Sequence, residues 1–194
     1  MIKITEFSKK PILYHVNMEI MEGITYIKGK NGSGKTTLLD CLAGIDKDYL
    51  GIIEGNKDVI YLNQQLYFYG RIKSKDLIQF FLGLNGIKDY LTYYESYVRL
   101  KRKKNMLREL YNKPIGLLSG GELKLLYFSI ISSMDRSWYI FDEPFAQVDE
   151  DGKKDMIDVF TELRREGRSV IITSHEEGFL HNLLDISIVN MDNL

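Results

Sequence analysis

The segment Gly29-Lys30-Asn31-Gly32-Ser33-Gly34-Lys35-Thr36 constrains the fold of this chain more than any other feature. It fits the pattern G-x-x-x-x-G-K-[ST], in which the glycines let backbone N–H groups point inward at phosphate oxygens. The β-branched run Ile24–Ile27 precedes it and predicts a strand, and Thr36–Ala43 follows with apolar residues at helical spacing. Strand, glycine-rich loop and helix together predict a phosphate-binding loop (P-loop).

Two side chains of this loop carry specific chemistry. Lys35 is placed to neutralise the β- and γ-phosphates of a nucleotide, and the Thr36 hydroxyl is placed to bind Mg²⁺. The dipole of the following helix adds positive potential at the same point. The loop therefore predicts a site for a phosphorylated nucleotide with Mg²⁺.

Strands and helices alternate along the rest of the chain, which predicts a mostly parallel α/β sheet. The aromatic and Lys-rich segment Leu66–Leu118 lacks strand alternation and is expected to be a helical insertion. A further helix is expected over Asp149–Glu166. Strands are expected at Met1–Phe7, Met18–Ile20, Asp58–Asn63, Trp138–Phe141, Ser169–Thr173 and Ile186–Val189.

Two carboxylates follow the buried strand Trp138–Phe141. Asp142 stands at the strand end, where P-loop enzymes hold the water shell of Mg²⁺. Glu143 lies one residue further on, where a general base for an attacking water belongs. An Asp-Glu pair also occurs in solvated turns, so the functional interpretation depends on the P-loop upstream.

The segment Leu118-Ser119-Gly120-Gly121-Glu122 is a second glycine-rich helix start. Ser119 is expected to cap a helix that runs to about Ser133. Its hydroxyl and the backbone N–H groups of the first turn are suited to an anion. Two such helix starts in one chain suggest that two copies share each nucleotide. The alternative is a serine cap followed by a simple Gly-Gly turn.

The combined set resembles the nucleotide-binding subunit of ATP-binding-cassette (ABC) transporters. Gly29–Thr37 resembles the Walker A loop, with Lys30 where proline is usual, and Leu118–Glu122 resembles the signature motif, with Glu122 where glutamine is usual. Ile140–Pro144 resembles Walker B followed by the catalytic glutamate. The remaining matches are Gln64 (or its neighbour Gln65) at the Q-loop, Asp149 at the D-loop, His175 as the switch histidine and Phe7 as the adenine-stacking aromatic.

The resemblance implies an α/β P-loop fold of ABC type, with a mostly parallel core sheet, an N-terminal antiparallel β subdomain and an inserted helical subdomain. It assigns residues 1–64 and 134–194 to the ATP-binding core, and residues 65–133 to the helical subdomain that ends in the signature helix. It implies an ATPase that uses ATP and Mg²⁺. The resemblance places catalysis on Glu143, His175 and Lys35, the metal on Thr36, Gln64 and Asp142, and further nucleotide contacts on Thr37, Ser119, Gly120, Gly121, Glu122 and Asp149.

The resemblance also implies partners. We expect a head-to-tail homo- or heterodimer that docks on a separate transmembrane permease and powers export. The 26 Lys and Arg residues nearly cancel the 27 Asp and Glu residues, so the basic excess typical of nucleic-acid binders is missing and no nucleic acid is expected. No apolar run approaches the roughly 20 residues that span a bilayer, which predicts a cytoplasmic protein held at the inner membrane face by its partner. The alternative is a soluble ABC-type ATPase that acts on ribosomes or DNA.

Three further features leave alternatives open. Leu125 stands where the family usually has arginine, which puts the strength of coupling between subunits in doubt. The basic run Arg99–Lys104 is either a solvated helix face or a contact for anionic lipid or nucleic acid. The aromatic residues between Tyr61 and Tyr97 are expected mainly in the core, with some forming a groove for a helix of the membrane partner.

Overall fold

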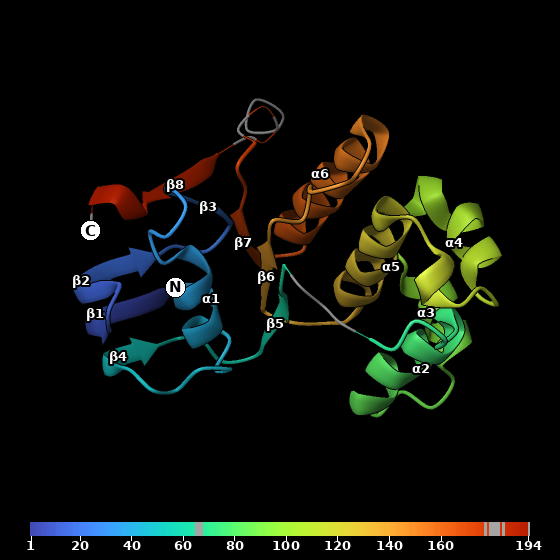
Figure 1. The fold of residues 1–194 in the computed structure, drawn as a ribbon, viewed down its shortest axis with the longest axis horizontal. Helices are drawn as coiled ribbons and strands as arrows, with labels where there is room; N and C mark the ends of the chain where they lie inside the picture. Colours follow the sequence, from blue (N-terminus) through green and yellow to red (C-terminus); the bar gives the residue numbers. More distant parts are fainter. Residues whose placement is uncertain (65–67, 177, 179–182, 184, 194) are drawn as a thin grey trace. The chain divides into compact units, whose positions relative to one another are not determined.

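The computed structural model describes residues 1–64, 68–176, 178, 183 and 185–193 (Figure 1). The chain forms two compact units. The first unit contains residues 1–64, 136–144 and 160–194, and the second contains residues 65–135 and 145–159. No described helix is both long and apolar enough to cross a membrane.

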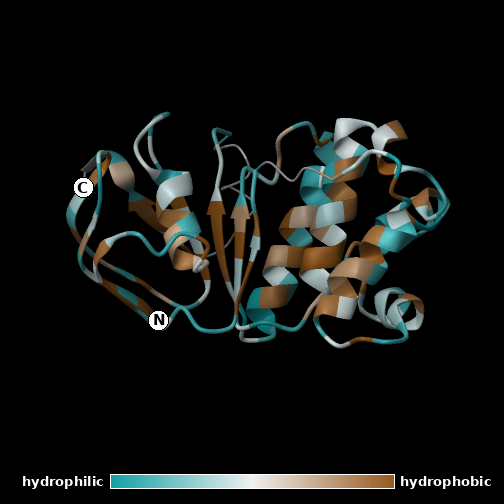
Figure 2. Ribbon diagram, turned by 60° about the horizontal axis from the view of Figure 1, so that its bottom comes forward, coloured by the Kyte–Doolittle hydropathy of each residue, from teal (hydrophilic) through white to brown (hydrophobic). Residues whose placement is uncertain are grey.

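A five-stranded parallel sheet forms the centre of the first unit, with strand order β5-β6-β7-β3-β8. Every residue of β6 and β7 is buried, because a parallel sheet is covered on both faces. Figure 2 shows the resulting apolar colour of the central strands. The strands are β3 (Ile24–Lys28), β5 (Val59–Leu62), β6 (Trp138–Asp142), β7 (Ser169–Thr173) and β8 (Ile186–Asn190), after which the short 3₁₀ helix η4 (Met191–Asn193) follows.

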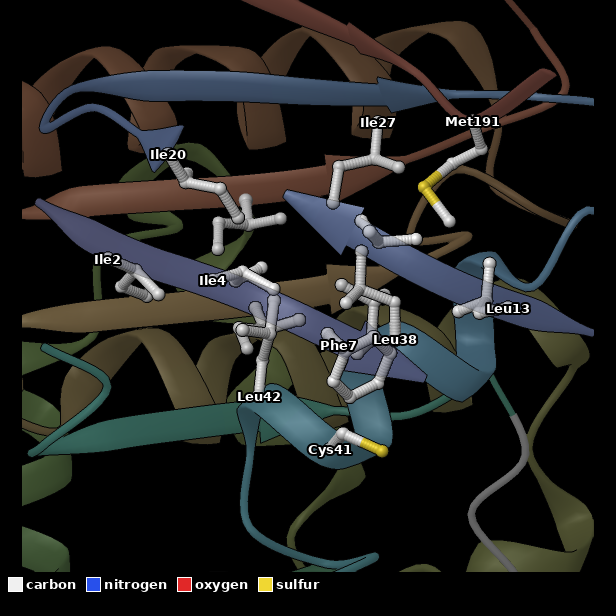
Figure 3. Close-up of a cluster of buried hydrophobic side chains, with 14 of the residues drawn as sticks. Ile2, Ile4, Phe7, Leu13, Ile20, Ile27, Leu38, Cys41, Leu42 and Met191 are labelled. Atoms are coloured by element: carbon white, nitrogen blue, oxygen red, sulfur yellow. The ribbon is translucent and has the colours of Figure 1, made fainter. Parts of the chain in front are cut away.

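A three-stranded antiparallel sheet of order β2-β1-β4 completes the first unit together with helix α1 (Lys35–Leu42). Its strands are β1 (Ile2–Lys9), β2 (Leu13–Ile20) and β4 (Leu50–Glu54). Figure 3 shows the apolar core, in which side chains of β1 and β2 meet Leu38, Cys41 and Leu42 of α1. The predicted antiparallel β subdomain is therefore present, and Cys41 is a buried hydrophobe as expected.

Strand β4 was not predicted from the sequence. Its residues are largely exposed and Gly51 interrupts it, so it shows no pattern of buried alternation. Gly51 has a backbone φ of 97°, and a Cβ there would lie 2.5 Å from the carbonyl oxygen of Glu6. The glycine thus permits a close backbone approach between β4 and β1 that a larger residue would block.

The second unit is helical, as expected for the insertion. Helices α2 and α3 both contact α5, which is buried along most of its length from Leu125 to Ser133. The unit also includes the first part of α6. The elements are α2 (Ser74–Leu84), α3 (Tyr90–Tyr97), η1 (Lys101–Lys103), α4 (Lys104–Leu110), η2 (Ile115–Leu117), α5 (Gly120–Ser133) and α6 (Glu150–Arg165).

Packing groups residues 145–159 with the helical unit, whereas the sequence assigned them to the ATP-binding core. Helix α6 is shared between the units: its residues up to 159 belong to the second unit, and its residues from Phe160 belong to the first. The functional division at residues 65 and 133 stays a prediction.

Candidate functional site

The loop between β3 and α1 has the backbone conformation that its glycines predict. Gly32 and Gly34 have φ angles of 82° and 91°, in the left-handed region that residues with a Cβ rarely adopt. Gly34 is also the N-cap of α1, and its carbonyl accepts the first helical hydrogen bond, from Leu38. The first-turn N–H groups of α1 are therefore directed at the space in front of the loop.

A pocket of about 240 Å³ opens at this helix start and takes all its lining from the first unit. We call it the P-loop pocket. Most of the residues that the sequence singled out for nucleotide, metal and catalysis come together here. The lining residues are Ile12, Lys30, Asn31, Gly32, Gly34, Lys35, Thr36, Thr37, Gln64, Asp142, Glu143 and His175.

Thr36 and Asp142 meet in the pocket although 106 residues separate them. The Thr36 hydroxyl donates to Oδ2 of Asp142 at 2.8 Å, and the Thr173 hydroxyl donates to Oδ1. The Asp142 carboxylate is 1% exposed and lies at the end of β6, as predicted. A hydroxyl and a carboxylate oxygen this close are the hard ligands that Mg²⁺ prefers, with phosphate and water supplying the rest.

Tyr61 is a neighbour of this pair that the sequence did not single out. Its hydroxyl lies 3.4 Å from Oδ2 of Asp142 and accepts a hydrogen bond from Nδ2 of Asn63 at 3.2 Å. Burial raises the pKa of the Tyr61 hydroxyl, and the nearby Asp142 carboxylate raises it further. Tyr61 therefore stays a neutral donor. Its place on β5 beside β6 comes from strand pairing, which the sequence pattern does not reveal.

Lys35 is folded back on its own loop. Its ammonium donates to the carbonyl of Gly29 at 2.6 Å and to that of Lys30 at 3.1 Å, and the residue is 8% exposed. These carbonyls hold the cation at the mouth of the P-loop. A phosphate that enters the pocket would meet a positive charge already in position.

Glu143 and His175 form the second close pair. The backbone N–H of His175 donates to Oε2 of Glu143 at 3.1 Å, and Nε2 of His175 lies 3.3 Å from Oε1. Among the described residues Oε1 is buried and accepts no hydrogen bond, although Nε2 of His175 faces it, so it can still take a proton from an incoming water. Burial raises the pKa of the Glu143 carboxyl, with Asp142 adding to the rise, while the hydrogen bond and charge of His175 and the charge of Lys35 oppose it.

The remaining loop and strand-end residues divide as follows. Gln64 is exposed and lines the pocket, whereas its alternative Gln65 lies outside the described residues. Gly29 and Ser33 belong to the loop but not to the pocket wall. A Cβ on Gly29 would lie 2.5 Å from the Ser33 hydroxyl oxygen, so Gly29 serves to close the loop on itself.

Phe7 does not lie in the pocket, and its predicted role as an adenine platform is corrected. The side chain is 0% exposed and packs in the core of the first unit (Figure 3). Its ring centroid lies 5.2 Å from that of Tyr49. A register shift follows Ile4 in β1, where Glu6 has a φ of 50°. This bulge turns Phe7 to the core face, so it offers no ring surface to a ligand.

Ile12 is the lining residue that sequence reasoning missed. It lies in the turn between β1 and β2, where its N–H donates to the carbonyl of Lys9 at 3.1 Å. It is 44% exposed and has no polar atom in its side chain. No periodic pattern marks a single apolar residue in a turn, so only the structure could place it beside the P-loop.

A second pocket, of about 700 Å³, belongs entirely to the helical unit. We call it the signature pocket. It brings together Asp149 and residues 119–122 of the predicted helix start, and adds four residues that the sequence did not assign to a site. The lining residues are Lys103, Met106, Ser119, Gly120, Gly121, Glu122, Leu125, Gln147 and Asp149.

The helix start in this pocket forms a reciprocal capping box. The Ser119 hydroxyl oxygen accepts from the N–H of Glu122 at 3.1 Å, and the Glu122 carboxylate accepts from the N–H of Ser119 at 2.8 Å. The second bond holds the pKa of Glu122 below its usual range. Glu122, which departs from the family's glutamine, thus performs a capping role and leaves the Ser119 O–H proton available as a donor.

Gln147 packs directly on the two glycines of the signature motif. A Cβ on Gly120 would lie 2.1 Å from Oε1 of Gln147, and a Cβ on Gly121 would lie 2.8 Å from its backbone oxygen. Gln147 itself has a φ of 67°, which is strained for a residue with a side chain. The Gly-Gly pair therefore has a packing reason independent of any ligand.

Asp149 and Leu125 both contribute to the start of α6. Oδ1 of Asp149 accepts from the N–H of Gly152 at 2.7 Å, which is N-cap geometry. A Cβ on Gly152 would lie 2.9 Å from this Oδ1 and 3.5 Å from Cδ1 of Leu125. Leu125, at the family's arginine position, is 6% exposed and packs as an apolar residue.

Two cations of the basic run Arg99–Lys104 form ion pairs within the helical unit. Nε of Arg102 lies 3.0 Å from Oδ1 of Asp155, and its NH2 group also pairs with Asp158. Lys104 pairs with Glu95 at 3.3 Å. This pairing favours the structural interpretation of the run over a contact for lipid or nucleic acid.

A family model described as ABC transporter matches residues 13–146 of the chain. The chain belongs to the ABC transporter ATP-binding family. An ABC transporter ATP-binding protein of Methanocaldococcus jannaschii, described as uncharacterized, is 31% identical over 186 residues, which cover 92% of this cassette and 68% of the relative. A solved structure of the ATP-binding subunit of an ABC transporter shares the fold, with a TM-score of 0.83 at 17% identity over 98% of this chain and 86% of that one.

Two further relatives differ in what their names say. The zinc import ATP-binding protein ZnuC of Ehrlichia ruminantium is 30% identical and covers 90% of this cassette and 72% of its own length. The cytochrome c biogenesis ATP-binding export protein CcmA of Shewanella oneidensis is 28% identical, and the match covers 90% of this cassette and 85% of CcmA. This cassette is an ATP-binding subunit of an ABC transporter that couples ATP hydrolysis to transport. Its relatives include an import and an export protein, so they do not resolve the direction of transport.

Proposed function

We propose that this cassette closes head to tail with a second cassette around two MgATP and drives a separate transmembrane subunit. The observation that carries the proposal is the P-loop pocket, in which Lys35, Thr36, Asp142, Glu143 and His175 converge from three segments of the sequence. Few other functions require a phosphate cradle, a pair of hard metal ligands and a buried carboxylate within one pocket.

The phosphate end of the site follows from the loop. Lys35 exchanges the carbonyls of Gly29 and Lys30 for the β- and γ-phosphates, and the N–H groups that open α1 bind the same oxygens. Thr36, Asp142 and Gln64 would hold Mg²⁺, which supplies charge neutralisation of the phosphates when bound.

Glu143 is proposed as the group that receives the proton of the attacking water. Its buried Oε1 has a free lone pair, and its other oxygen is fixed by the backbone N–H of His175. The His175 side chain, which is 54% exposed, reaches the γ-phosphate side of the pocket. These two residues orient the water and steady the charge that develops on the γ-phosphate.

The signature pocket is proposed to complete the site of the opposing cassette. Its Ser119 hydroxyl, its Gly120 and Gly121 amides and the positive end of α5 offer donors that suit a phosphate. Asp149 borders the same pocket. A solved cassette described as dimeric has the same fold, with a TM-score of 0.81 over 98% of this chain, which supports this arrangement.

A third, apolar pocket on the helical unit is proposed to receive a helix of the transmembrane subunit. It measures about 360 Å³ and is lined by Phe68, Ile72, Asp76, Leu77 and Phe80. The rings of Phe68 and Phe80 lie 6.1 Å apart, and Phe80 is 51% exposed. Exposed aromatic surface of this kind is a common groove for an amphipathic helix, and Asp76 at its rim suits a basic residue of that helix.

A pair of variants separates this docking role from nucleotide chemistry. Phe80→Glu should abolish co-purification with the permease while ATP still binds to the isolated cassette. Leu50→Glu replaces an apolar residue of similar exposure, 67%, on β4 of the first unit and should leave co-purification intact. Equal loss in both variants would argue against the groove.

Export is the direction that the sequence predicts, and it is carried here as part of the proposal. The relative CcmA is named as an export protein and ZnuC as an import protein. Transport of a cargo into or out of vesicles that contain the cassette and its permease decides this point.

The test of the whole proposal is affinity capture of a tagged Glu143→Gln variant from detergent-solubilised native cells with MgATP. A polytopic membrane protein in near-stoichiometric yield, together with a dimeric cassette, is the expected result. If ribosomal or DNA-associated proteins are captured and no membrane protein is, the transporter proposal is wrong. The alternative, a soluble ATPase that acts on ribosomes or DNA, would then take its place.

A further inference from the structure

Thr173 is a buried residue at the end of strand β7, beside the two carboxylates of the P-loop pocket. Its side chain is 0% exposed, and it does not line the pocket itself. In the parallel pairing of β6 with β7, the Cα partner of Thr173 is Asp142. Paired residues of neighbouring strands present their side chains on the same face of a sheet, so strand register brings this hydroxyl to the carboxylate.

The Thr173 hydroxyl makes two hydrogen bonds of opposite direction. The backbone N–H of Glu143 donates to its oxygen at 3.0 Å, and the hydroxyl itself donates to Oδ1 of Asp142. A backbone N–H can only donate, so the Thr173 oxygen accepts from Glu143 and the hydroxyl proton is left for the carboxylate. One buried hydroxyl therefore connects the Asp142 side chain with the Glu143 backbone.

The two oxygens of the Asp142 carboxylate are held from different sides. The hydroxyls of Thr36 and Tyr61 both lie at Oδ2, at 2.8 Å and 3.4 Å, whereas Thr173 donates to Oδ1. Thr36 belongs to the P-loop and is itself proposed to bind the metal. Thr173 belongs to the sheet, so its bond fixes the plane of the carboxylate from the side of the core.

The backbone of Glu143 also depends on this hydroxyl. Glu143 has a φ of 51°, in the left-handed region that a residue with a side chain occupies only when its surroundings hold it there. Its N–H is fixed by Thr173, and its Oε2 accepts from the N–H of His175. Because φ is the rotation about the N–Cα bond, a bond that fixes the N–H also fixes the direction in which the Glu143 side chain leaves the backbone.

We propose that Thr173 is a positioning residue, whose single hydroxyl keeps the metal-binding carboxylate of Asp142 and the base Glu143 in a fixed relation to each other. The proposal rests on the proposed roles of Asp142 and Glu143. Without the hydroxyl, the Asp142 carboxylate loses its donor at Oδ1, and the strained backbone of Glu143 loses the acceptor of its N–H. Partners that orient a metal-binding carboxylate typically change metal affinity or activity by about 10–100-fold when they are removed.

The first experiment measures the affinity for a non-hydrolysable ATP analogue with Mg²⁺ and with EDTA. Thr173→Val removes the hydroxyl and keeps the branched shape of the side chain. The gain in affinity that Mg²⁺ brings should fall by at least about tenfold, while the affinity in EDTA stays unchanged. Thr173→Ser retains the hydroxyl and should restore most of the gain.

Thr25→Val is the matched control. Thr25 lies on β3, which pairs with β7 in the same sheet, and it is 1% exposed. Its hydroxyl has no hydrogen-bond partner among the described residues. The same substitution at a similarly buried position should therefore leave both affinities unchanged.

The second experiment measures steady-state ATP hydrolysis at saturating Mg²⁺. In Thr173→Val the kcat should fall by about 10–100-fold, because the base is no longer held in place. The KM for ATP should stay within about threefold, because the phosphate contacts of Lys35 and the P-loop are untouched. Thr173→Ser should recover most of the kcat, which a role in packing alone would not predict.

The outcomes separate this inference from the proposed function. If Thr173→Val behaves like Thr25→Val in both experiments, Thr173 positions neither group and the inference is wrong. If Thr173→Val does not fold, Thr173→Ser and Thr173→Ala replace it, and equal values for these two would overturn the inference. If Asp142→Asn keeps the full gain from Mg²⁺ and Glu143→Gln keeps its turnover, the proposed roles of those two residues are wrong, whatever Thr173 does.

Discussion

The carboxylate of Glu143 and the imidazole of His175 lie 3.3 Å apart, at the ends of neighbouring parallel strands. The backbone N–H of His175 also donates to Glu143 at 3.1 Å. The histidine thus holds the proposed base through its backbone and faces it with its side chain. Because the two contacts involve different parts of one residue, they can be separated by mutation.

The pH dependence of ATP hydrolysis should report on Glu143. A general base acts in its deprotonated form, so activity should fall as the pH falls through its pKa. Burial raises that pKa above the ordinary glutamate value of 4.5, so the acid limb of the kcat profile should lie above the range of an exposed glutamate. Steady-state rates between about pH 5 and 9 measure this limb.

The variant His175→Asn tests whether Glu143 or His175 is the group whose titration produces the acid limb of the kcat profile. The charge of His175 lowers the pKa of Glu143, so its removal should move the limb to higher pH. Disappearance of the limb in this variant would assign it to the histidine instead.

Glu143→Gln should stabilise the nucleotide-free cassette at neutral pH. A carboxyl with a raised pKa in the folded state favours folding when protonated, and that contribution is lost as the pH rises through the folded pKa. The amide imitates the protonated form, so the Tm at pH 7–8 should rise by about 2–4 °C. The difference in Tm between the variant and the unmodified protein should shrink as the pH falls toward the raised pKa of Glu143. A variant Tm below that of the unmodified protein at pH 8 would contradict the burial argument.

Alanine substitutions at Gly120 and Gly121 should respond differently to a change at Gln147. The Gly120→Ala Cβ collides with the side-chain end of Gln147, whereas the Gly121→Ala Cβ collides with its backbone oxygen. Gly121→Ala should lose about 1–3 kcal/mol of unfolding free energy, and Gly120→Ala should lose less, because the flexible end of the Gln147 side chain can move away. Adding Gln147→Ala should restore the first and not the second.

Denaturant unfolding of the four variants and Gln147→Ala alone gives the coupling energies directly. Equal rescue of both glycine variants would show that the segment moves as a whole, against the packing described here.

Arg102→Ala should destabilise the helical unit by about 1–2 kcal/mol. It leaves Asp155, which is 6% exposed, without its cationic partner, although the 66% exposure of Arg102 limits the cost through solvent screening. Lys154→Ala removes one half of an exposed pair with Asp151 and should change stability by less than about 0.5 kcal/mol. Thermal or chemical unfolding compares the two, and an effect of Arg102→Ala as small as the control would mean that water replaces the pair.

Most of the fold could be predicted because it rests on local signals. The β-branched run before the P-loop, the glycines of the loop and the Ser119 cap each act within a few residues, and the structure confirms the strand, the loop conformation and the Ser119 cap. Strand β4 escaped prediction because its residues are exposed and its partner β1 is remote in the sequence.

The sequence by itself determined the P-loop, the order of the motifs and the helical character of the insertion. Tertiary structure decided which side chains reach the site. A bulge at Glu6 moved Phe7 to the core, a turn placed Ile12 on the P-loop, and strand pairing brought Glu143 to His175. The reason is physical: glycine freedom and helix capping are properties of neighbouring residues, whereas the face that a side chain presents depends on the register and packing of strands far apart in the chain.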